Sequence, residues 1–539
     1  MDPSVDIFNE DYHEGEGEDS ESDDDVSIGE DPETIENNVE VRLGISEAQA
    51  KANYAAAGTE VDEEEERITI LGNPHLMSPE IDACLERIIE ELHMPYKPAE
   101  FQRVAINALG DQKNLILTSP TGSGKMNVPL LATLVLREKF QNFKGVAIVT
   151  QPLSSIMNEK MKNDVCEVAV LSMSGELRTS TDDEDANLSC DLQELLDGKY
   201  PVLFGHPESF DSKVGQHVLR ELQRLDRLIL ICIDEFHQGG EGHWNTFRPS
   251  MMKGSAGLRL YGVKNCPSLA MTATATHAEI QEVVAALGLR TLPVILTSTP
   301  VQAHIKFSMV RRPSNNFGLD GTITKKGDKN PGLMDLLQRV FLKQYLDDLS
   351  KDRKPKKCII FCRGNGVLGA LYSRMMELTN YRYSDCRDSP FVMNHSSLLP
   401  PTEKVLARRA SEISLYLTSN KMLLGIDLAD IDVIIFLRPY NQPAALVQGG
   451  GRGGRRMESG KRRRVQVYQF FNSQDFTSQN KLMSPVMKRI CQSQLCTRTL
   501  LKDHFVGNSE QKEEQETDKS HCCHSCDKLE LGLETMNLE

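Results

Sequence analysis

Features that would mark a membrane or secreted protein are missing from the sequence. No stretch approaches the roughly 20 consecutive apolar residues that a membrane-spanning helix requires, so we expect no membrane partner. The N-terminus lacks a basic start followed by an apolar run, so we expect no secretory signal. The 13 cysteines are scattered along 539 residues without such a signal, which favours reduced thiols inside the cell.

Basic residues are absent from the first 40 positions, which contain 17 Asp or Glu residues. The net charge of the chain is −17, so residues 41–539 hold 61 acidic and 61 basic residues and are neutral. A stretch such as EDSESDDDVSIGEDPE (18–33) repels itself and has little to bury, which predicts a disordered acidic tail over residues 1–66. A solubilising tail is favoured. The alternative is an arm that binds a basic or protein partner, or that covers a basic groove.

Apolar runs alternate with helical patterns from residue 113 onward. Most of these runs are hydrophobic throughout rather than at every second residue, which indicates strands buried on both faces. Strands that alternate with helices, such as VPLLATLVLREKF (128–140), indicate a parallel sheet covered by helices on both sides. The predicted strands are NLILTS (114–119), GVAIVTQ (145–151), PVLFG (201–205), RLILICIDE (227–235) and SLAMTAT (268–274).

A polar segment rich in Gly and Asn, residues 312–332, predicts a linker. The alternation then resumes, and after residue 480 the pattern becomes helical and contains cysteines. The sequence therefore predicts an α/β protein with two tandem parallel-sheet domains and a small C-terminal helical unit. The strands of the second sheet are predicted at 358–364, 391–396, 413–419, 432–438 and 465–471.

The segment SPTGSGK (119–125) lies between a predicted strand and a predicted helix. Glycines allow backbone amides to turn inward around phosphate oxygens, and the N-terminus of the helix adds a favourable dipole. Lys125 can reach the outer phosphates of a nucleotide. A phosphate-binding loop is therefore favoured over a chance glycine-rich turn.

Two acidic residues end the predicted strand RLILICIDE. Asp234 is at the carboxyl end of a parallel strand, the edge at which such sheets bind ligands. An aspartate there can hold Mg²⁺ through water, and Glu235 can orient an attacking water. Capping of the following helix is the alternative, but the phosphate loop upstream favours a nucleotide site.

The segment QGGGRGGR (448–455) presents Arg452 and Arg455 in a glycine-rich setting. Arginine suits the transition-state charge on a γ-phosphate, and such residues contribute roughly 10³–10⁵ in rate. An RGG-like RNA-binding segment is the alternative. The position shortly after the predicted strand at 432–438 favours the catalytic interpretation.

These motifs together resemble superfamily 2 helicases, and within them the RecQ family of 3′–5′ DNA helicases. The resemblance covers residues 95–530 and includes four further motifs. They are QPLSSIM (151–157), GHPESF (205–210), MTATAT (271–276) and LLGIDLADIDVIIF (423–436), in the last of which Leu423 replaces a glycine.

The resemblance implies two RecA-like domains that bind ATP and Mg²⁺ between them. It implies nucleotide contacts from the residues Gln102, Thr121, Gly122, Ser123, Gly124, Lys125, Met126 and Asp427. It implies catalytic roles for Lys125, Asp234, Glu235, His237, Gln448, Arg452 and Arg455. It further implies contacts with single-stranded DNA from Pro152, Ser154, Ser155 and Thr274.

The stretch EGHWNTFRPSM (241–251) resembles the aromatic-rich loop of RecQ helicases, with one extra residue. Aromatic faces stack on unpaired bases at roughly 1–3 kcal/mol per base. Trp244 is the only tryptophan in the sequence and lies in a Gly/His/Asn-rich segment, which favours DNA contact over burial in a core. The resemblance implies that Trp244, Phe247 and Arg248 contact DNA.

The C-terminal cysteines resemble the RecQ zinc-binding subdomain, in which Cys496 would be the first ligand. Cys523 and Cys526 have the two-residue spacing of a tight Zn²⁺ chelate. The family's last cysteine is replaced by Leu529, so the fourth ligand is sought among Cys522, His521 and His524. A Cys-rich tail with an incomplete site is the alternative.

Met126 stands where a phosphate loop of this kind has a serine or threonine that holds Mg²⁺. A neutral, soft thioether cannot replace a hydroxyl for a hard cation. Water can fill the position, because Mg²⁺ usually keeps several waters, and Asp234 remains on the opposite side. We therefore predict that ATP binding survives and hydrolysis is weakened.

The predicted function is an ATP-dependent 3′–5′ helicase that acts on single-stranded and duplex DNA. It corresponds to a short RecQ form without winged-helix and HRDC domains. Two alternatives are a helicase-like binding protein with impaired hydrolysis and an RNA helicase of the same superfamily. The basic stretch RRMESGKRRR (455–464) favours the nucleus. The expected domains are a tail (1–66), two RecA-like domains (67–305 and 306–480), a zinc-binding subdomain (481–530) and a tail (531–539).

Overall fold

The computed structural model describes part of the chain, and all structural statements refer to that part. The described residues are 45–61, 69–71, 77–94, 97–151, 165–180, 187–236, 266–286, 293–312, 332–380, 389–394, 409, 411–419, 430–454, 461–477, 483–506, 522–523 and 525–526. Among them, no helix combines the length and the apolar character needed to cross a membrane.

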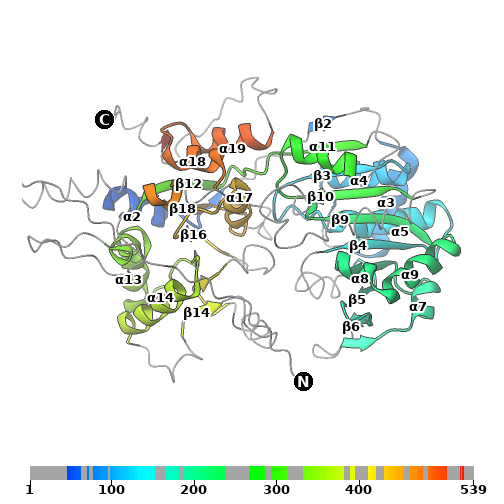
Figure 1. The fold of residues 1–539 in the computed structure, drawn as a ribbon, viewed down its shortest axis with the longest axis horizontal. Helices are drawn as coiled ribbons and strands as arrows, with labels where there is room; N and C mark the ends of the chain where they lie inside the picture. Colours follow the sequence, from blue (N-terminus) through cyan, green and yellow to red (C-terminus); the bar gives the residue numbers. More distant parts are fainter. Residues whose placement is uncertain are drawn as a thin grey trace, which may run out of the picture. The chain divides into compact units, whose positions relative to one another are not determined.

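The first half of the chain builds a ten-stranded sheet with a parallel centre (Figure 1). Seven neighbouring strands pair in parallel, while β2, β6 and β7 pair antiparallel at the edges. In spatial order the strands are β2 (Thr69–Leu71), β11 (Val294–Thr297), β3 (Leu115–Thr118), β10 (Ser268–Thr272), β9 (Leu228–Asp234), β4 (Val146–Thr150), β8 (Val202–Gly205), β5 (Val168–Leu171), β6 (Leu177–Ser180) and β7 (Asn187–Ser189).

Helices bury both faces of this sheet, as the continuous hydrophobicity of its strands predicts. Alternate residues of one strand enter opposite cores: Leu115 and Leu117 face one apolar cluster, and Ile116 faces the other. The helices α3 (Pro79–Glu91), α4 (Glu100–Gly110) and α5 (Asn127–Lys139) contribute to the first cluster. The second cluster receives α7 (Leu192–Leu196), α8 (Pro207–Asp211), α9 (Lys213–Arg224) and α11 (His277–Ala286).

The second half builds a six-stranded sheet that is parallel throughout. Its strands, in spatial order, are β12 (Ile305–Arg311), β18 (Val465–Phe471), β16 (Val433–Phe436), β13 (Cys358–Phe361), β15 (Leu415–Thr418) and β14 (Phe391–Asn394). Its helical elements are α12 (Leu333–Leu337), the π-helix η2 (Gln338–Leu342), α13 (Lys343–Ser350), α14 (Asn365–Leu378), α17 (Pro443–Gly450) and the 3-10 helix η4 (Ser473–Phe476). The predicted α/β class with two parallel sheets is confirmed.

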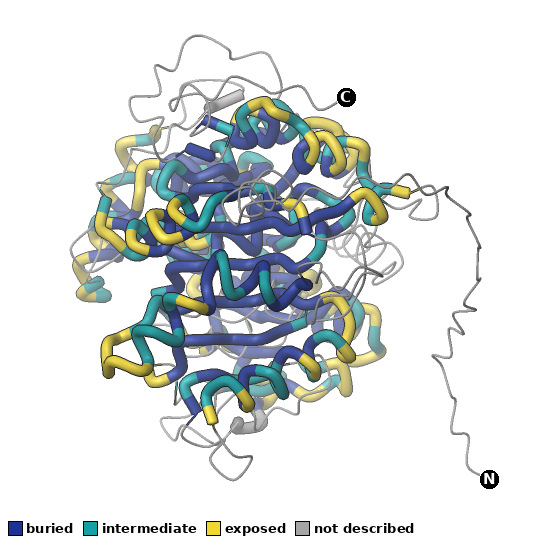
Figure 2. The backbone as a smooth tube through the Cα atoms, turned by 90° about the vertical axis from the view of Figure 1, so that its left-hand side faces the viewer, coloured by how far each residue is buried: buried dark blue, intermediate teal, exposed yellow. Residues whose placement is uncertain are grey.

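The C-terminal helices α18 (Pro485–Gln492) and α19 (Thr497–Phe505) share an apolar cluster with the second sheet. Met487 and Leu501 are fully buried in it, together with Phe307 of β12. Figure 2 shows the described backbone as a tube whose buried segments lie inside and whose exposed segments lie toward the outside. The domain boundaries expected at 305/306 and 480/481 stay predictions.

Residues 45–61 correct the expectation of disorder over 1–66, which is wrong for this stretch. They form α2 (Glu47–Ala56) and β1 (Glu60–Val61), and β1 pairs with β17 (Arg462–Arg463). Ser46 caps the helix by accepting a hydrogen bond from the Gln49 N–H at 3.0 Å. The Tyr54 hydroxyl donates to Asp348 at 2.8 Å, and its ring packs against Phe341. This stretch folds because Ile45, Ala50 and Tyr54 bury apolar surface.

Candidate active site and metal centre

The loop between β3 and α5 has the backbone of a phosphate cradle. Gly122 and Gly124 have φ angles of 81° and 84°, a region that residues with side chains rarely adopt. A Cβ on Gly124 would lie 2.8 Å from Gln102 Nε2, so a larger residue there would displace this side chain. The loop lies between a strand and a helix, as predicted, and its phosphate-binding role stays a prediction.

Lys125 is held within the loop that it belongs to. Its Nζ donates to the Ser119 carbonyl at 2.6 Å and to the Pro120 carbonyl at 2.8 Å. Ser123 accepts a hydrogen bond from the Ser119 hydroxyl at 2.6 Å. The ammonium group therefore has a defined position beside the cradle, where carbonyl oxygens take the role that phosphate oxygens would take.

Asp234 is a buried carboxylate at the carboxyl end of β9, with 5% of its surface exposed. It accepts hydrogen bonds from Gln151 Nε2 at 2.6 Å and from the Glu235 N–H at 2.9 Å. Burial and the neighbouring Glu235 charge raise the pKa of Asp234 to about 7, although Lys125 and the Gln151 bond act in the opposite direction. The ionised carboxylate is therefore destabilised and would gain from a bound cation.

The donor atoms at this point fit Mg²⁺, which takes oxygen ligands. Asp234 and Glu235 supply carboxylate oxygens, and the Gln151 Oε1 atom is buried with no hydrogen-bond partner among the described residues. Glu235 has a φ of 52°, a left-handed conformation that costs a non-glycine residue of order 1–3 kcal/mol. Strain of this kind is common at functional sites.

A chain of hydrogen bonds leads from the acidic pair to the second sheet. The Thr272 hydroxyl at the end of β10 donates to Glu235 Oε2 at 3.1 Å, and the Thr274 N–H donates to Thr272 Oγ1 at 3.3 Å. Gln448 of α17 then donates to Thr274 Oγ1 at 3.2 Å and is 5% exposed. Glu235 is therefore connected to α17 by hydrogen bonds through Thr272 and Thr274.

The loop after α17 approaches the phosphate loop. A Cβ on Gly451 would lie 3.0 Å from Thr121 Cβ, so the two backbones are close at this point. The Arg452 N–H donates to the Gly449 carbonyl at 3.1 Å, which continues the helical turn. Gly454 has a φ of 60°, so it ends this turn in a conformation suited to glycine.

Met126 and Gln102 flank the cradle with contacts of different kinds. Met126 occupies the N-cap of α5 without a side-chain cap and packs against the first apolar cluster. Gln102 is buried, accepts from the Ala99 N–H at 2.8 Å and donates to the Gly124 carbonyl at 2.9 Å. Its amide therefore connects α4 to the phosphate loop, while its contact with the nucleotide stays a prediction.

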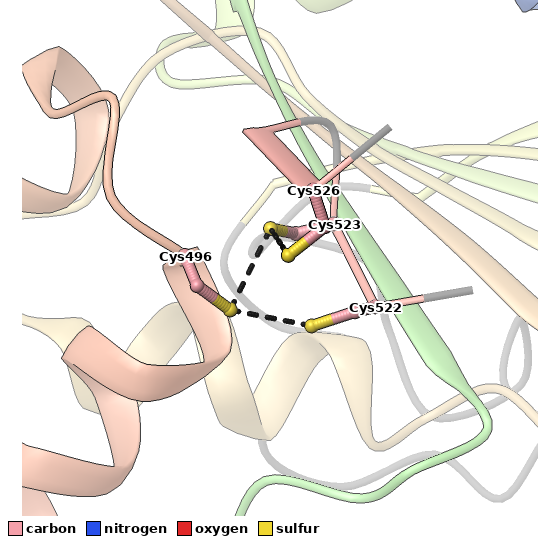
Figure 3. Close-up of side chains that lie close together, drawn as sticks. All are labelled: Cys496, Cys522, Cys523 and Cys526. Atoms are coloured by element: carbon pink, nitrogen blue, oxygen red, sulfur yellow. Dashed lines mark hydrogen bonds between the residues drawn. The ribbon is translucent and has the colours of Figure 1, made fainter. Parts of the chain in front are cut away.

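Four cysteines converge between α19 and the C-terminal segment, with their side chains pointing toward one another (Figure 3). All four sulfurs lie within 4.8 Å of one another. Cys496 Sγ lies 3.3 Å from Cys522 Sγ and 3.8 Å from Cys523 Sγ, and Cys523 Sγ lies 3.6 Å from Cys526 Sγ. A tetrahedral zinc with bonds of about 2.3 Å separates its sulfur ligands by about 3.8 Å, so this set fits the ion.

Hydrogen bonds within the cluster shift the pKa values of its thiols in opposite directions. Contacts with the Cys522 and Cys523 thiols lower the pKa of Cys496, whereas the same contact with Cys496 raises the pKa of Cys522. Cys522 is the candidate fourth ligand that lies beside Cys496, which the resemblance implied, and beside Cys523 and Cys526, which have chelate spacing.

Residues 99–283 match the family model described as DEAD/DEAH box helicase. This part of the chain is similar to DEAD/DEAH box helicase domains. Its limits enclose the phosphate loop, the acidic pair and the two threonines, but not the second sheet.

Three curated proteins to which this chain is similar are RecQ-like helicases, at modest identity. It is 27% identical over 226 residues to ATP-dependent DNA helicase Q-like 5 of Arabidopsis thaliana and 31% identical over 195 residues to helicase Q-like 4B of the same plant. It is 24% identical over 219 residues to ATP-dependent DNA helicase RecQ of Pasteurella multocida. These alignments cover 41%, 35% and 39% of this chain and 23%, 15% and 30% of the relatives, so less than a third of each relative is matched.

Solved helicase structures share the fold over most of the chain. The DUF1998 helicase MrfA bound to DNA aligns with a TM-score of 0.54 at 15% identity, over 83% of this chain and 54% of that chain. Its complex with DNA and AMPPNP gives a TM-score of 0.52 at 15% identity, over 81% and 54% of the two chains. The fold that this chain shares with these structures therefore extends beyond residues 99–283. The expected resemblance to RecQ-like helicases is confirmed.

Several expected residues of the helicase site lie outside the described residues. The described part contains Lys125, Asp234, Glu235, Gln448 and Arg452, which the contacts above bring to neighbouring loops. The others are His237, Asp427, Arg455, Pro152, Ser154, Ser155, Trp244, Phe247 and Arg248.

Gln151 and Thr272 are site residues that the sequence reasoning did not single out. Gln151 ends the predicted strand 145–151 and Thr272 ends β10; both strands pair with β9, and strand ends at one edge of a parallel sheet converge. That rule, applied to β4 and β10 as it was to β9, would have found both.

Proposed function

We propose that this chain is an ATP-dependent helicase that moves 3′–5′ along single-stranded DNA and separates duplexes. The observation that carries the proposal is the hydrogen-bonded path from Glu235 through Thr272 and Thr274 to Gln448. It connects a nucleotide site on the first sheet with a helix of the second, as a motor requires. The printed names of the RecQ-like relatives, and the DNA bound to MrfA, support DNA as the substrate.

Each residue of the site has a defined task in this mechanism. Lys125 would exchange the carbonyls of Ser119 and Pro120 for phosphate oxygens of ATP. Asp234 and Glu235 would hold Mg²⁺, which neutralises phosphate charge when bound. Glu235 would also orient the attacking water. Arg452 and Arg455 are proposed to stabilise the transferring phosphoryl group.

The coupling step follows from the hydrogen-bonded path. When ATP is hydrolysed, the environment of Glu235 changes, and Thr272 responds because its hydroxyl donates to that carboxylate. Thr274 and Gln448 pass the change to α17. Trp244, Phe247 and Arg248 are proposed to hold the unpaired bases that this movement advances.

The cysteine cluster is proposed to bind one Zn²⁺ through Cys496, Cys522, Cys523 and Cys526. The four cysteines belong to two chain segments, and their thiols alone would hold these segments together only weakly. A structural zinc would fix α19 to the C-terminal segment. We also propose a nuclear location, on the strength of the basic stretch at 455–464.

The test uses the full chain and its Lys125→Ala variant with forked or tailed DNA. We expect the wild type to unwind duplexes with a 3′ single-stranded tail in the presence of ATP and Mg²⁺, and the variant to be inactive. Preference for a 5′ tail would refute the polarity. Stronger stimulation of hydrolysis by RNA than by DNA would favour an RNA helicase.

Met126 supports a second candidate, a helicase-like protein that binds nucleic acid with impaired hydrolysis. Its side chain packs in an apolar cluster and offers no oxygen to a cation. Tight binding of single-stranded DNA without measurable hydrolysis by the wild type would favour this candidate.

A further inference from the structure

Residues 298–304 carry the chain from β11 of the first sheet to β12 of the second. The Ser298 N–H donates to the Thr118 carbonyl at 3.0 Å, at the point where β3 ends and the phosphate loop begins. Gln302 Nε2 donates to the Thr121 carbonyl at 3.1 Å, inside that loop. This inter-sheet linker, residues 298–304, is not the segment 312–332 that the sequence predicted as a linker. It contacts the proposed nucleotide site through residues of the first sheet's domain.

The same linker touches the arginine-containing loop, residues 451–454. His304 lies so close to Gly454 that a Cβ on this glycine would come within 2.6 Å of His304 Cδ2. The His304 carbonyl also accepts from the Val465 N–H at 3.0 Å. Burial lowers the pKa of His304 to about 3, so the ring is neutral and acts as a packing surface.

Arg498 of α19 holds this linker by its backbone. Its Nη2 atom donates to the Ala303 carbonyl at 2.9 Å and to the Ile305 carbonyl at 3.1 Å, on both sides of His304. The residue is 7% exposed and lies two positions after Cys496. A guanidinium bound to two carbonyls fixes the path of the linker between them.

The cysteine cluster meets the linker a second time. Cys523 forms a parallel β-bridge with Phe307 of β12, two residues beyond the carbonyl of Ile305 that Arg498 binds. Cys496 is the N-cap of α19, the helix that carries Arg498. The cluster is therefore connected to the start of β12 through both of its chain segments.

We propose that Arg498 is a positioning residue for ATP hydrolysis, which fixes the linker so that the phosphate loop and the arginine-containing loop face one nucleotide in register. This inference rests on the proposed function. Gln302 reaches Thr121 and His304 supports Gly454 only while the backbone between them keeps its path. A misplacement of about 1 Å in such a site lowers turnover by up to about 100-fold.

The experiment compares Arg498→Ala, Arg498→Lys and the matched control Arg489→Ala, an exposed arginine of α18. Hydrolysis is measured with saturating single-stranded DNA over a range of ATP concentrations. For Arg498→Ala we expect kcat to fall about 10- to 100-fold with KM nearly unchanged, because alignment is lost rather than nucleotide binding. Lysine can serve both carbonyls from one nitrogen, so it should restore most of kcat. The control should behave as the wild type.

A second readout reports on the linker itself. Hydrogen exchange of residues 298–305, measured without nucleotide, should be faster in Arg498→Ala than in the wild type and close to the wild type in Arg498→Lys. If the alanine variant does not fold, Arg498→Met, which keeps an apolar stem but has no donor, replaces it in both measurements.

The outcomes separate this inference from the proposed function. A wild type without DNA-stimulated hydrolysis would refute the proposed function, whatever the variants do. An active wild type with an equally active Arg498→Ala or Arg498→Met variant would overturn the inference alone. An equal loss of kcat in the lysine and alanine variants would also overturn it, because donation to the carbonyls would then not be the cause.

Discussion

Replacing Asp234 by asparagine should stabilise the fold while it destroys the site. The ionised carboxylate is buried beside Glu235, and its pKa rises from 3.8 to about 7. Asparagine keeps the shape and carries no charge. Its oxygen can accept from the Glu235 N–H, and its amide can donate to the partnerless Gln151 Oε1 if the Gln151 amide turns over.

The magnitude follows from proton linkage. Because the folded-state pKa of Asp234 is raised, ionisation of this carboxyl lowers the free energy of unfolding of the wild type. This loss is absent below about pH 4, where the carboxyl is protonated in the folded and the unfolded state. It grows as the pH rises toward 7 and is complete above that pH. Linkage gives about 1.5–2 kcal/mol at pH 5 and about 4 kcal/mol at pH 8. The stabilisation by Asp234→Asn should therefore be about 2.5 kcal/mol larger at pH 8 than at pH 5.

Thermal unfolding of the ligand-free protein at both pH values is the assay. For a domain of 150–250 residues, about 2.5 kcal/mol corresponds to about 5–10 °C in Tm. The control is Asp352→Asn, at an exposed position with a φ of 52° that asparagine adopts readily. This control should shift Tm equally at both pH values. An Asp234→Asn variant whose Tm difference is the same at pH 5 and pH 8 would refute the reasoning.

Three further predictions address other parts of the molecule. Met126→Ser restores a hydroxyl at the cation position and should raise DNA-stimulated hydrolysis several-fold; turnover equal to that of the wild type would show that the methionine is harmless. The purified chain should contain about one zinc, measured by mass spectrometry, which Cys523→Ser loses and the control Cys266→Ser retains; a metal-free wild type would contradict this. Tyr54→Phe removes the hydrogen bond to Asp348 and should lower the free energy of unfolding by about 1–2 kcal/mol, seen in denaturant titration; an unchanged midpoint would show that α2 contributes little there.

Ten of the parallel strands, five in each sheet, could be predicted, most of them because they are buried on both faces; the parallel strands β5, β11 and β12 were missed. RLILICIDE predicted β9 and placed Asp234 at its end, since continuous hydrophobicity and a terminal carboxylate are local signals. The edge strands β6 and β7 were missed, because short strands at a sheet edge lack such a run. The fold of residues 45–61 was missed because an acidic composition next to it suggested a longer tail.

In the candidate site too, features of neighbouring residues could be predicted from the sequence, whereas contacts between distant residues could not. The glycines of the phosphate loop and the spacing of Cys523 and Cys526 are visible in the sequence. The contacts of Gln302 with Thr121 and of Arg498 with Ala303 join residues about 180 and 195 positions apart. No periodicity or motif marks such pairs, so only the folded chain reveals them.

The central claim is that nucleotide chemistry on the first sheet is coupled to the second through Gln448. The direct test is the ratio of ATP hydrolysis rates with and without single-stranded DNA, in the wild type, in Gln448→Ala and in the control Gln442→Ala at the N-cap of the same helix. We predict at least about tenfold stimulation in the wild type and the control, and a ratio near one in Gln448→Ala. A Gln448→Ala variant stimulated as strongly as the wild type would contradict the account.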